Sequence, residues 1–323
     1  MFRQLQLFAL LSSMLVTALV QAAPPASGCP VTDAEALEWL SRMSHSLRET
    51  SYRGVFTYQQ GGSTQAMRIS HAVAGNVEHE QITRLSGDSV RVERTAHPLD
   101  CIHPGHRLVR LGDTYRQQGE SCGLATSYDL RMAGTHRIAG RDAVIINVLP
   151  RDRFRYGYQI ALDQETGLLL KTQTVAGDGR VLERFQFAEI QIGDAAGSGT
   201  DVELIHRAPH RHGYERPAAP ATALAWSVNW LPEGFVITDD IAASGHNKTF
   251  TDGLANFSVF LEPLPQMPAP GAGMARQGGT TSYSRGVDLS GRPVLITVLG
   301  EIPAGTARQV ADSVSWVTTQ PSR

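Results

Sequence analysis

Histidines are the residues of this sequence whose type and spacing most clearly suggest a chemical function. His206, His210 and His212 lie within one short segment, and three imidazoles are enough to hold a zinc ion. The segment mixes them with Arg and Pro, however, which favours a solvated basic strip over a metal site. We therefore predict no metal here.

Two other clusters of potential ligand residues are closely spaced in the sequence, but neither has the pattern of a known binding site. His103-Pro-Gly-His106 is typical of a surface turn, and Asp163-Gln-Glu165-Thr-Gly167 shares only its acids with a calcium loop. The motifs G-x-S-x-G, P-loop, H-E-x-x-H and G-x-G-x-x-G after a strand are absent from the sequence. We predict that the protein is not an enzyme and has no catalytic residues, metal or cofactor.

The cysteines leave two alternatives open. In an oxidising compartment Cys101 and Cys122 could close a loop of about twenty residues, a bond worth about 3 kcal/mol in the chain-entropy model. Cys29 is then left over. The alternative is that all three thiols are free, because a sequence does not supply the geometry that a disulfide requires.

The N-terminus predicts export. Residues 1–22 combine Arg3, an apolar run over 7–20 and the small-residue cleavage pattern Val20-Gln-Ala22, as a Sec-type signal peptide does. The apolar run is shorter than the about 20 residues that span a bilayer. We expect cleavage near Ala22 and a soluble, exported protein. In the alternative, residues 26–29 form a lipoprotein box with Cys29 acylated, but Pro24-Pro25 disfavours it.

Charge and length indicate which class of protein this is. The chain has 29 Lys and Arg against 31 Asp and Glu, and no basic stripe that would indicate nucleic acid. Its 323 residues, 41% of them hydrophobic, are enough for two domains with their own cores.

The stretch 128–192 predicts an antiparallel sheet. Apolar runs at 143–150, 156–162, 168–175 and 180–192 are separated by short turn segments that leave no room for crossover helices. The run 143–149 is apolar almost throughout, so we expect it to be a central strand or one covered on both faces. Earlier strands are expected at 52–58, 65–73, 77–85 and 89–95, with a short one at 107–111.

Alternation within these strands identifies one apolar face of the sheet. A strongly twisted sheet of about nine strands tends to curl. When one or two helices plug it, the curled sheet leaves an apolar hollow suited to a hydrophobic ligand. One helix is expected at 33–49, with Thr32 and Glu35 at capping-box spacing. The candidate lining residues of the hollow are Phe56, Tyr58, Tyr158, Ile160, Phe185 and Phe187.

A second, smaller domain follows a linker rich in Gly, Ala and Pro. We place the signal peptide at 1–22, the larger domain at 31–200, the linker at 201–224 and a small domain at 225–319. Strands are expected at 225–230, 235–239, 248–251, 254–261, 281–287 and 293–299, with Asp252-Gly253 as a hairpin turn. The segment 262–279 is expected to be a loop, and Thr306 to cap a final helix over 307–317.

One set of residues, in order along nearly the whole mature chain, forms a pattern that matches a known family. The set comprises Trp39-Leu40, 52–58, Cys101-Ile102, 128–130, 139–141, 150–152, 155–157, Leu162-Asp163, 166–168, 182–187, 230–235, Asp252-Gly253 and 257–260. Together these residues resemble the RseB/MucB family of periplasmic sigma-E factor regulators, its MucB branch in particular. The linker, Cys122 and the 262–279 loop depart from the family pattern.

The resemblance implies a fold and a function. The fold would be α+β: an incomplete antiparallel β-barrel of the type of the lipoprotein carriers LolA and LolB, plugged by helices, plus a smaller sheet-and-helix domain. The protein would bind the periplasmic region of a membrane-spanning anti-sigma factor (RseA or MucA) and protect it from proteolysis, until lipid or lipopolysaccharide releases it. We leave open a homo-oligomer, and as an alternative function a lipoprotein carrier or lipid-binding periplasmic chaperone.

Overall fold

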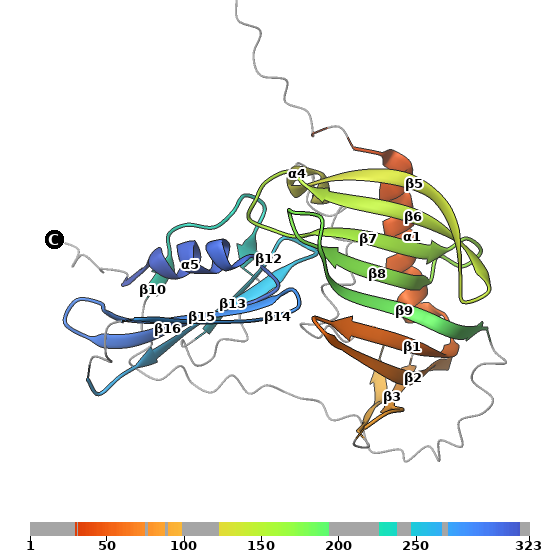
Figure 1. Ribbon diagram of the computed structural model, residues 1–323, viewed down its shortest axis with the longest axis horizontal. Coiled ribbons are helices and arrows are strands. Elements are labelled where there is room, and N and C mark those ends of the chain that lie inside the picture. The colour runs from red at the N-terminus through yellow and green to blue at the C-terminus, as the bar shows by residue number, and fades with distance from the viewer. Residues whose placement is uncertain are drawn as a thin grey trace, which may run out of the picture.

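The computed structural model describes residues 30, 32–74, 77–87, 90–98, 123–193, 226–237, 247–266 and 271–316. They form a larger domain, from α1 to β9, and a smaller domain, from β10 to β17 (Figure 1). The predicted signal peptide 1–22, the linker 201–224 and the strand at 107–111 lie outside the described residues. So do the histidine clusters, Cys29 and the predicted Cys101–Cys122 pair.

The larger domain is an open, curled sheet of nine strands in the order β4-β3-β2-β1-β9-β8-β7-β6-β5. Each neighbouring pair is antiparallel, which confirms the predicted fold class. The strands are β1 (Tyr52–Gln60), β2 (Ser63–Ala74), β3 (Val77–Arg84), β4 (Arg91–Pro98), β5 (Tyr128–Ile138), β6 (Arg141–Pro150), β7 (Gly157–Asp163), β8 (Leu169–Val175) and β9 (Val181–Ile192).

Helix α1 (Ala34–Glu49) crosses this sheet, as the sequence predicted, but its cap differs. The N-cap is Asp33, whose carboxylate accepts from the backbone N–H groups of Glu35 and Ala36 at 3.0 and 3.4 Å. Thr32 instead bonds to the backbone of Leu130 on β5, accepting from its N–H at 2.8 Å. The capping-box prediction was therefore wrong by one residue, because Thr32 is used to attach the helix to the sheet.

Two strands at the end of the larger sheet differ from the predictions. Strand β5 was not predicted as a strand, since its sequence mixes polar residues with Gly134 and its pairing with β6 is interrupted by a bulge between Met132 and Thr135. The apolar strand β6 lies second from the edge and is not central. Its residues Ile146 and Val148 are fully buried, whereas Leu149 on the other face is 40% exposed.

The smaller domain contains a six-stranded antiparallel sheet in the order β11-β12-β13-β16-β15-β14 and a short β10-β17 pair. Its core lies between the larger of these sheets and α5, around Phe257, Val259, Ile296 and Val310. The elements are β10 (Trp226–Val228), β11 (Val236–Ile237), β12 (Asn247–Thr251), β13 (Asn256–Pro263), β14 (Ala272–Gln277), β15 (Thr280–Asp288), β16 (Pro293–Gly300), α5 (Ala304–Asp312) and β17 (Val314–Trp316).

The expected hairpin turn at Asp252-Gly253 is confirmed, since it joins β12 to β13. Other predictions for this domain were wrong. The expected loop 262–279 contains edge strand β14, and the end of the expected helix forms β17. The cap of α5 is Pro303 without a side-chain hydrogen bond, while the Thr306 hydroxyl donates to the carbonyl of Phe154 in the larger domain at 3.0 Å. In the described part of the chain, no helix is long and apolar enough to cross a lipid bilayer.

Candidate functional site

The six predicted lining residues lie on one face of the larger sheet. Directly opposed residues of an antiparallel pair project to the same face. Ile160 is opposite Thr172, Thr172 is opposite Phe185, and Phe185 is opposite Tyr58. Tyr158, Phe56 and Phe187 lie two residues along their strands from members of this row and therefore share its face. The structure thus brings the six side chains together, while their role as a ligand lining remains a prediction.

Four of the aromatic residues among them, Phe56, Tyr58, Phe185 and Phe187, form one cluster. The ring centroids of Phe56 and Phe185 are 4.8 Å apart, and those of Phe185 and Phe187 are 5.2 Å apart. Phe56 and Phe187 are buried, whereas Phe185 and Tyr58 are half-buried. Burial and the carboxylate of Glu183 raise the pKa of the Tyr58 hydroxyl to about 12, so it stays a neutral hydrogen-bond donor. The cluster is apolar with a polar rim.

Helix α1 covers the other part of this face. Ala36, Leu40 and Met43 pack in one cluster with Ile160, and Tyr158 packs against that cluster. Leu47, near the end of the helix, packs against the aromatic cluster. The apolar face is therefore partly occupied by the helix, and the half-buried side chains of Tyr58, Tyr158 and Phe185 lie where its cover is incomplete.

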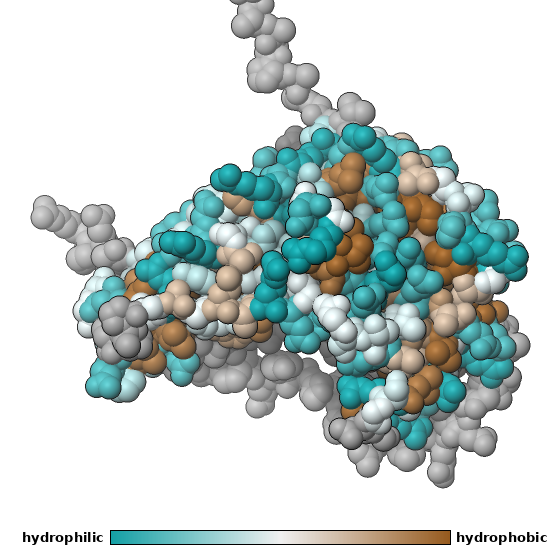
Figure 2. Space-filling model, viewed as in Figure 1, coloured by the Kyte–Doolittle hydropathy of each residue, from teal (hydrophilic) through white to brown (hydrophobic). Residues whose placement is uncertain are grey.

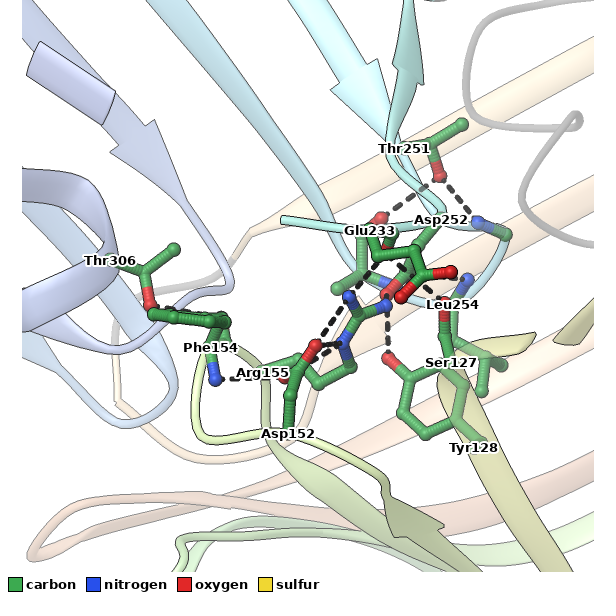
Figure 3. A network of polar contacts seen from close by, with 12 residues as sticks. Ser127, Tyr128, Asp152, Phe154, Arg155, Glu233, Thr251, Asp252, Leu254 and Thr306 are labelled. Atoms are coloured by element: carbon green, nitrogen blue, oxygen red, sulfur yellow. Dashed lines mark hydrogen bonds and ion pairs between the residues drawn. The ribbon is translucent and has the colours of Figure 1, made fainter. Parts of the chain in front are cut away.

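The boundary between the two domains is built around a buried arginine. Arg155 lies in the turn between β6 and β7, and its side chain has no exposed surface. It donates to Asp252 of the smaller domain at 2.6 Å, to the carbonyl of Glu233 at 2.5 Å and to Asp152 at 2.9 Å (Figure 3). Its guanidinium also lies over the ring of Phe235, at 5.0 Å from the centroid. One side chain thus joins three segments.

Asp252 is the partner of Arg155 and is equally buried. One carboxylate oxygen accepts from the hydroxyl of Tyr128 at 2.9 Å, and the other from the backbone N–H groups of Leu254 and Ala255. Burial raises the pKa of this carboxyl, and the charge of Arg155 and the backbone N–H groups only partly offset that rise. The pair is therefore held in a site where neither charge has access to water.

Further contacts extend along the same boundary. The carboxylate of Glu183 on β9 accepts from the backbone N–H of Gly279 at 3.0 Å, and the Tyr156 hydroxyl donates to the carbonyl of Ile302 at 3.3 Å. The rings of Phe154 and Trp230 meet edge to face at 5.1 Å. The two domains are joined by polar bonds, ion pairing and aromatic packing together.

The acidic loop at 163–167 has a structural role. Asp163 is buried and pairs with Arg141, with bonds of 2.5 and 2.9 Å, and accepts from both the N–H and the hydroxyl of Thr166. Burial alone would raise the pKa of Asp163, but these hydrogen bonds outweigh it and lower the pKa. No group of three His, Cys, Asp or Glu suited to a metal was found in the described residues.

Comparison with known proteins decides the family. The sequence model of the MucB/RseB N-terminal domain matches residues 35–209, and that of the MucB/RseB C-terminal domain matches residues 220–315. This chain belongs to the MucB/RseB family. The sigma factor AlgU regulatory protein MucB of Pseudomonas aeruginosa is 34% identical over 306 residues, covering 88% of this chain and 92% of MucB. The sigma-E factor regulatory protein RseB of Escherichia coli is 24% identical, covering 95% and 97%.

Solved MucB structures match this chain over most of its length. MucB in the Pseudomonas aeruginosa MucA/MucB complex superposes with a TM-score of 0.68 at 31% identity, covering 88% of this chain and 100% of that one. A crystal structure of MucB gives a TM-score of 0.55 at 31% identity, covering 88% of this chain and 99% of that one. These matches confirm the resemblance to the MucB/RseB family that the sequence indicated.

The domain boundary was missed as a site when the sequence was considered alone. Each of its main segments nevertheless carried part of the family resemblance: 150–152, 155–157, 230–235 and Asp252-Gly253 all meet there. A charged residue beside a turn is ordinarily solvated, so the pattern alone did not distinguish Arg155 from a surface arginine. The shared feature of these segments is visible only once the fold brings them together.

Proposed function

We propose that this protein is a periplasmic regulator of the sigma-E envelope-stress response that binds the periplasmic region of a membrane-spanning anti-sigma factor. The observation that carries the proposal is the match, over both domains, to MucB solved in complex with MucA. The predicted signal peptide supports the periplasmic location, because it would export the chain to the side of the membrane where the periplasmic region of the anti-sigma factor lies.

We further propose that binding protects the anti-sigma factor from proteolysis. Holding about 99% of the target requires free regulator at about 100 times the dissociation constant, which stabilises the bound target by about 2.7 kcal/mol. A releasing ligand must therefore bind the free regulator better than the complex by at least that amount. Each buried CH₂ group contributes about 0.8 kcal/mol, so a few methylenes on an apolar surface are sufficient. The face that carries Phe185 and Tyr158 is the surface that supports release by lipid or lipopolysaccharide.

The test measures binding of the purified protein to an anti-sigma periplasmic fragment by titration calorimetry, with and without lipopolysaccharide. We expect tight binding that lipopolysaccharide weakens. Phe185→Asp and Tyr158→Asp should each retain the fragment in the presence of lipopolysaccharide, because a carboxylate disfavours acyl chains on this face. Gln186→Asp, which lies between Phe185 and Phe187 and projects to the other face of the same strand, is the matched control and should be released normally. Release that is unchanged in both Asp variants would refute the role of the apolar face.

An apolar face also suits a lipoprotein carrier or a lipid-binding chaperone, which is the alternative function. The discriminating arm replaces the anti-sigma fragment by an acylated lipoprotein in the same titration. Capture of the lipoprotein without capture of the fragment would favour the carrier. The smaller domain, which is joined to the larger one through a buried ion pair, favours the regulator, because a carrier needs only the apolar face.

A further inference from the structure

The face of the larger sheet that points away from α1 carries a row of amide side chains. Helix α1 lies behind the strands in Figure 1, so this outer face is turned toward the viewer. Asn147 of β6 is opposite Gln159 of β7, which is opposite Gln173 of β8, and opposed residues project to one face. Since Gln159 precedes Ile160 of the apolar face, the row lies on the other side of the sheet. The Gln159 amide donates to the side-chain oxygen of Asn147 at 3.2 Å, and Arg184 of β9 continues the row opposite Gln173.

Two cations at the end of this row have no counter-charge. Lys171 lies two residues from Gln173 along β8, so it shares the outer face and stands diagonally across from Arg184. In the described part of the chain neither cation pairs with a carboxylate, and the Nε of Arg184 is buried without an acceptor. Burial lowers the pKa of the Lys171 ammonium, and the charge of Arg184 lowers it further. An anion between the two side chains would replace this repulsion by attraction.

The other arginines that are withdrawn from water in this domain show what Arg184 lacks. Arg141 is paired with Asp163, and Arg155 with Asp252. Arg184 is half-buried, yet no carboxylate of the described residues reaches it. The partner that the protein supplies to the other two arginines would here be supplied by a ligand.

The length of the row indicates the kind of anion. Neighbouring strands are about 4.8 Å apart, so the row from Asn147 to Arg184 extends over about 14 Å. An inorganic anion would contact only the two cations. An amide offers both a donor and an acceptor, as a sugar hydroxyl does, so the three amides suit the hydroxyl groups of linked sugars. An anionic membrane would require more than two cations, because each contributes only about 1 kcal/mol there.

We propose that the outer face of the larger sheet binds an acidic oligosaccharide along this row. The acidic group of one sugar lies between Lys171 and Arg184, and hydroxyl groups of the neighbouring sugars bond to the amides of Gln159 and Asn147. The site uses neither the apolar face nor the contact between the domains. It is therefore a second binding surface, beyond the regulatory function proposed above.

The probe is tetragalacturonate, a chain of sugars that each carry a carboxylate, titrated by calorimetry into the full mature chain at low ionic strength. Lys171→Gln and Arg184→Gln should each weaken its binding about tenfold, because each removes a charge-assisted hydrogen bond. Arg53→Gln is the matched control, since it makes the same change of charge on the same face about 20 Å away, where Arg53 bonds to Gln191. Both cation variants should be at least as stable to urea as the wild type, because each relieves the repulsion. Weaker binding would then not reflect unfolding.

Two further probes separate the charge from the hydroxyl groups. Maltotetraose has hydroxyl groups without charge, and inorganic sulfate has charge without a sugar, so each should bind about tenfold more weakly than tetragalacturonate. Gln159→Leu should weaken binding of the sugar and leave that of sulfate unchanged. Sulfate that binds as tightly as tetragalacturonate would overturn the assignment to a sugar, and equal binding by the wild type and both cation variants would overturn the site itself. No anti-sigma fragment takes part, so the result is independent of the proposed function.

Discussion

At the scale of single residues, the pair Arg155 and Asp252 has the largest energetic consequence. Both side chains are fully buried, so each depends on the other for compensation of its charge. A buried ion pair contributes little compared with an apolar pair of the same volume, because desolvation offsets the attraction. Removing one partner is different, since the remaining charge is left in a site without water.

Arg155→Met should therefore destabilise the protein strongly. We expect a loss of about 3–5 kcal/mol in the free energy of unfolding, measured by urea titration with tryptophan fluorescence. The double variant Arg155→Met with Asp252→Leu should recover most of the loss, because no fully buried charge is left unpaired; Asp152, which also loses Arg155, is 26% exposed and remains in contact with water. Arg180→Met is the control, since its pair with Asp178 is exposed. A double variant that is no more stable than Arg155→Met would show that the lost bonds to Glu233 and Asp152 matter more than the unpaired charge.

Residues were predicted from the sequence where a repeating pattern marked them. The alternation in 156–162 and 181–187 identified Tyr158, Ile160, Phe185 and Phe187, and the cross-strand register places all four on one face. The roles of Arg155 and Leu254 followed no such pattern. Leu254 is a single apolar residue in a turn, and its packing partners are contributed by the other domain. Contacts between domains leave no periodicity in the sequence.

At the scale of elements, α1 shows how a helix is fixed to a sheet. The Asp33 carboxylate caps the helix with one oxygen and accepts from the N–H of Met132 on β5 with the other, at 3.3 Å. The same residue thus starts the helix and attaches it to β5, the strand beside which the apolar side of the helix packs. Strand β5 could not be recognised in the sequence, because its burial depends on α1 and on β6 and not on its own alternation.

Asp33→Ala should remove both interactions at once. The loss of an N-cap costs about 0.5–2 kcal/mol, and the bond to β5 adds to it. Asp33→Asn keeps the capping oxygen but turns an amide donor toward the N–H of Met132, so it should recover only part of the loss. The measurement is the urea midpoint followed by far-ultraviolet circular dichroism. If the Asn variant were as stable as the wild type, the bond to Met132 would contribute nothing.

Elements were predicted well where turns and apolar runs were regular, and poorly at edges. Strand β14 has every residue exposed, and its Ala-Gly-Met-Ala sequence has no apolar alternation, so only its pairing with β15 makes it a strand. The final helix was predicted too long, since Val314 continues the apolar spacing of α5 but belongs to β17, which pairs with β10. Long-range pairing decided both cases.

At the scale of the whole molecule, the two domains contact each other at one end of each sheet. Figure 2 shows that hydrophobic and hydrophilic residues are interspersed over the face of the larger sheet turned toward the viewer. The aromatic cluster and α1 instead share a continuous apolar lining. The turns at 60–63, 151–156, 252–255 and 278–279 all contribute to the contact between the domains. A change in the protonation of the side chains at this contact should therefore alter the relative placement of the domains.

Glu301, in the loop between β16 and α5, is the group that should make the placement depend on pH. Burial and the charge of Glu183 raise the pKa of its carboxyl above the usual 4.5, and burial also raises that of Asp252. An acid whose pKa is raised in the closed arrangement stabilises that arrangement below its usual pKa, and this contribution is lost as the pH rises through the raised value. Asp163, whose pKa is lowered, lies within the larger domain and does not contribute to separation of the domains.

We therefore expect the domains to separate more readily as the pH is increased from 4.5 toward 8. The radius of gyration of the mature chain, measured by small-angle scattering across this range, should increase with pH. Glu301→Gln should show a smaller increase, because its amide carries no charge to desolvate and only the raised pKa of Asp252 still acts at the contact, whereas Glu262→Gln on the exposed end of β13 should behave as the wild type. A wild-type radius that stays constant would show that Glu301 retains its neighbours at all these pH values and that its ionisation does not set the closed arrangement. A radius that falls as the pH rises would contradict the expected sign of the effect.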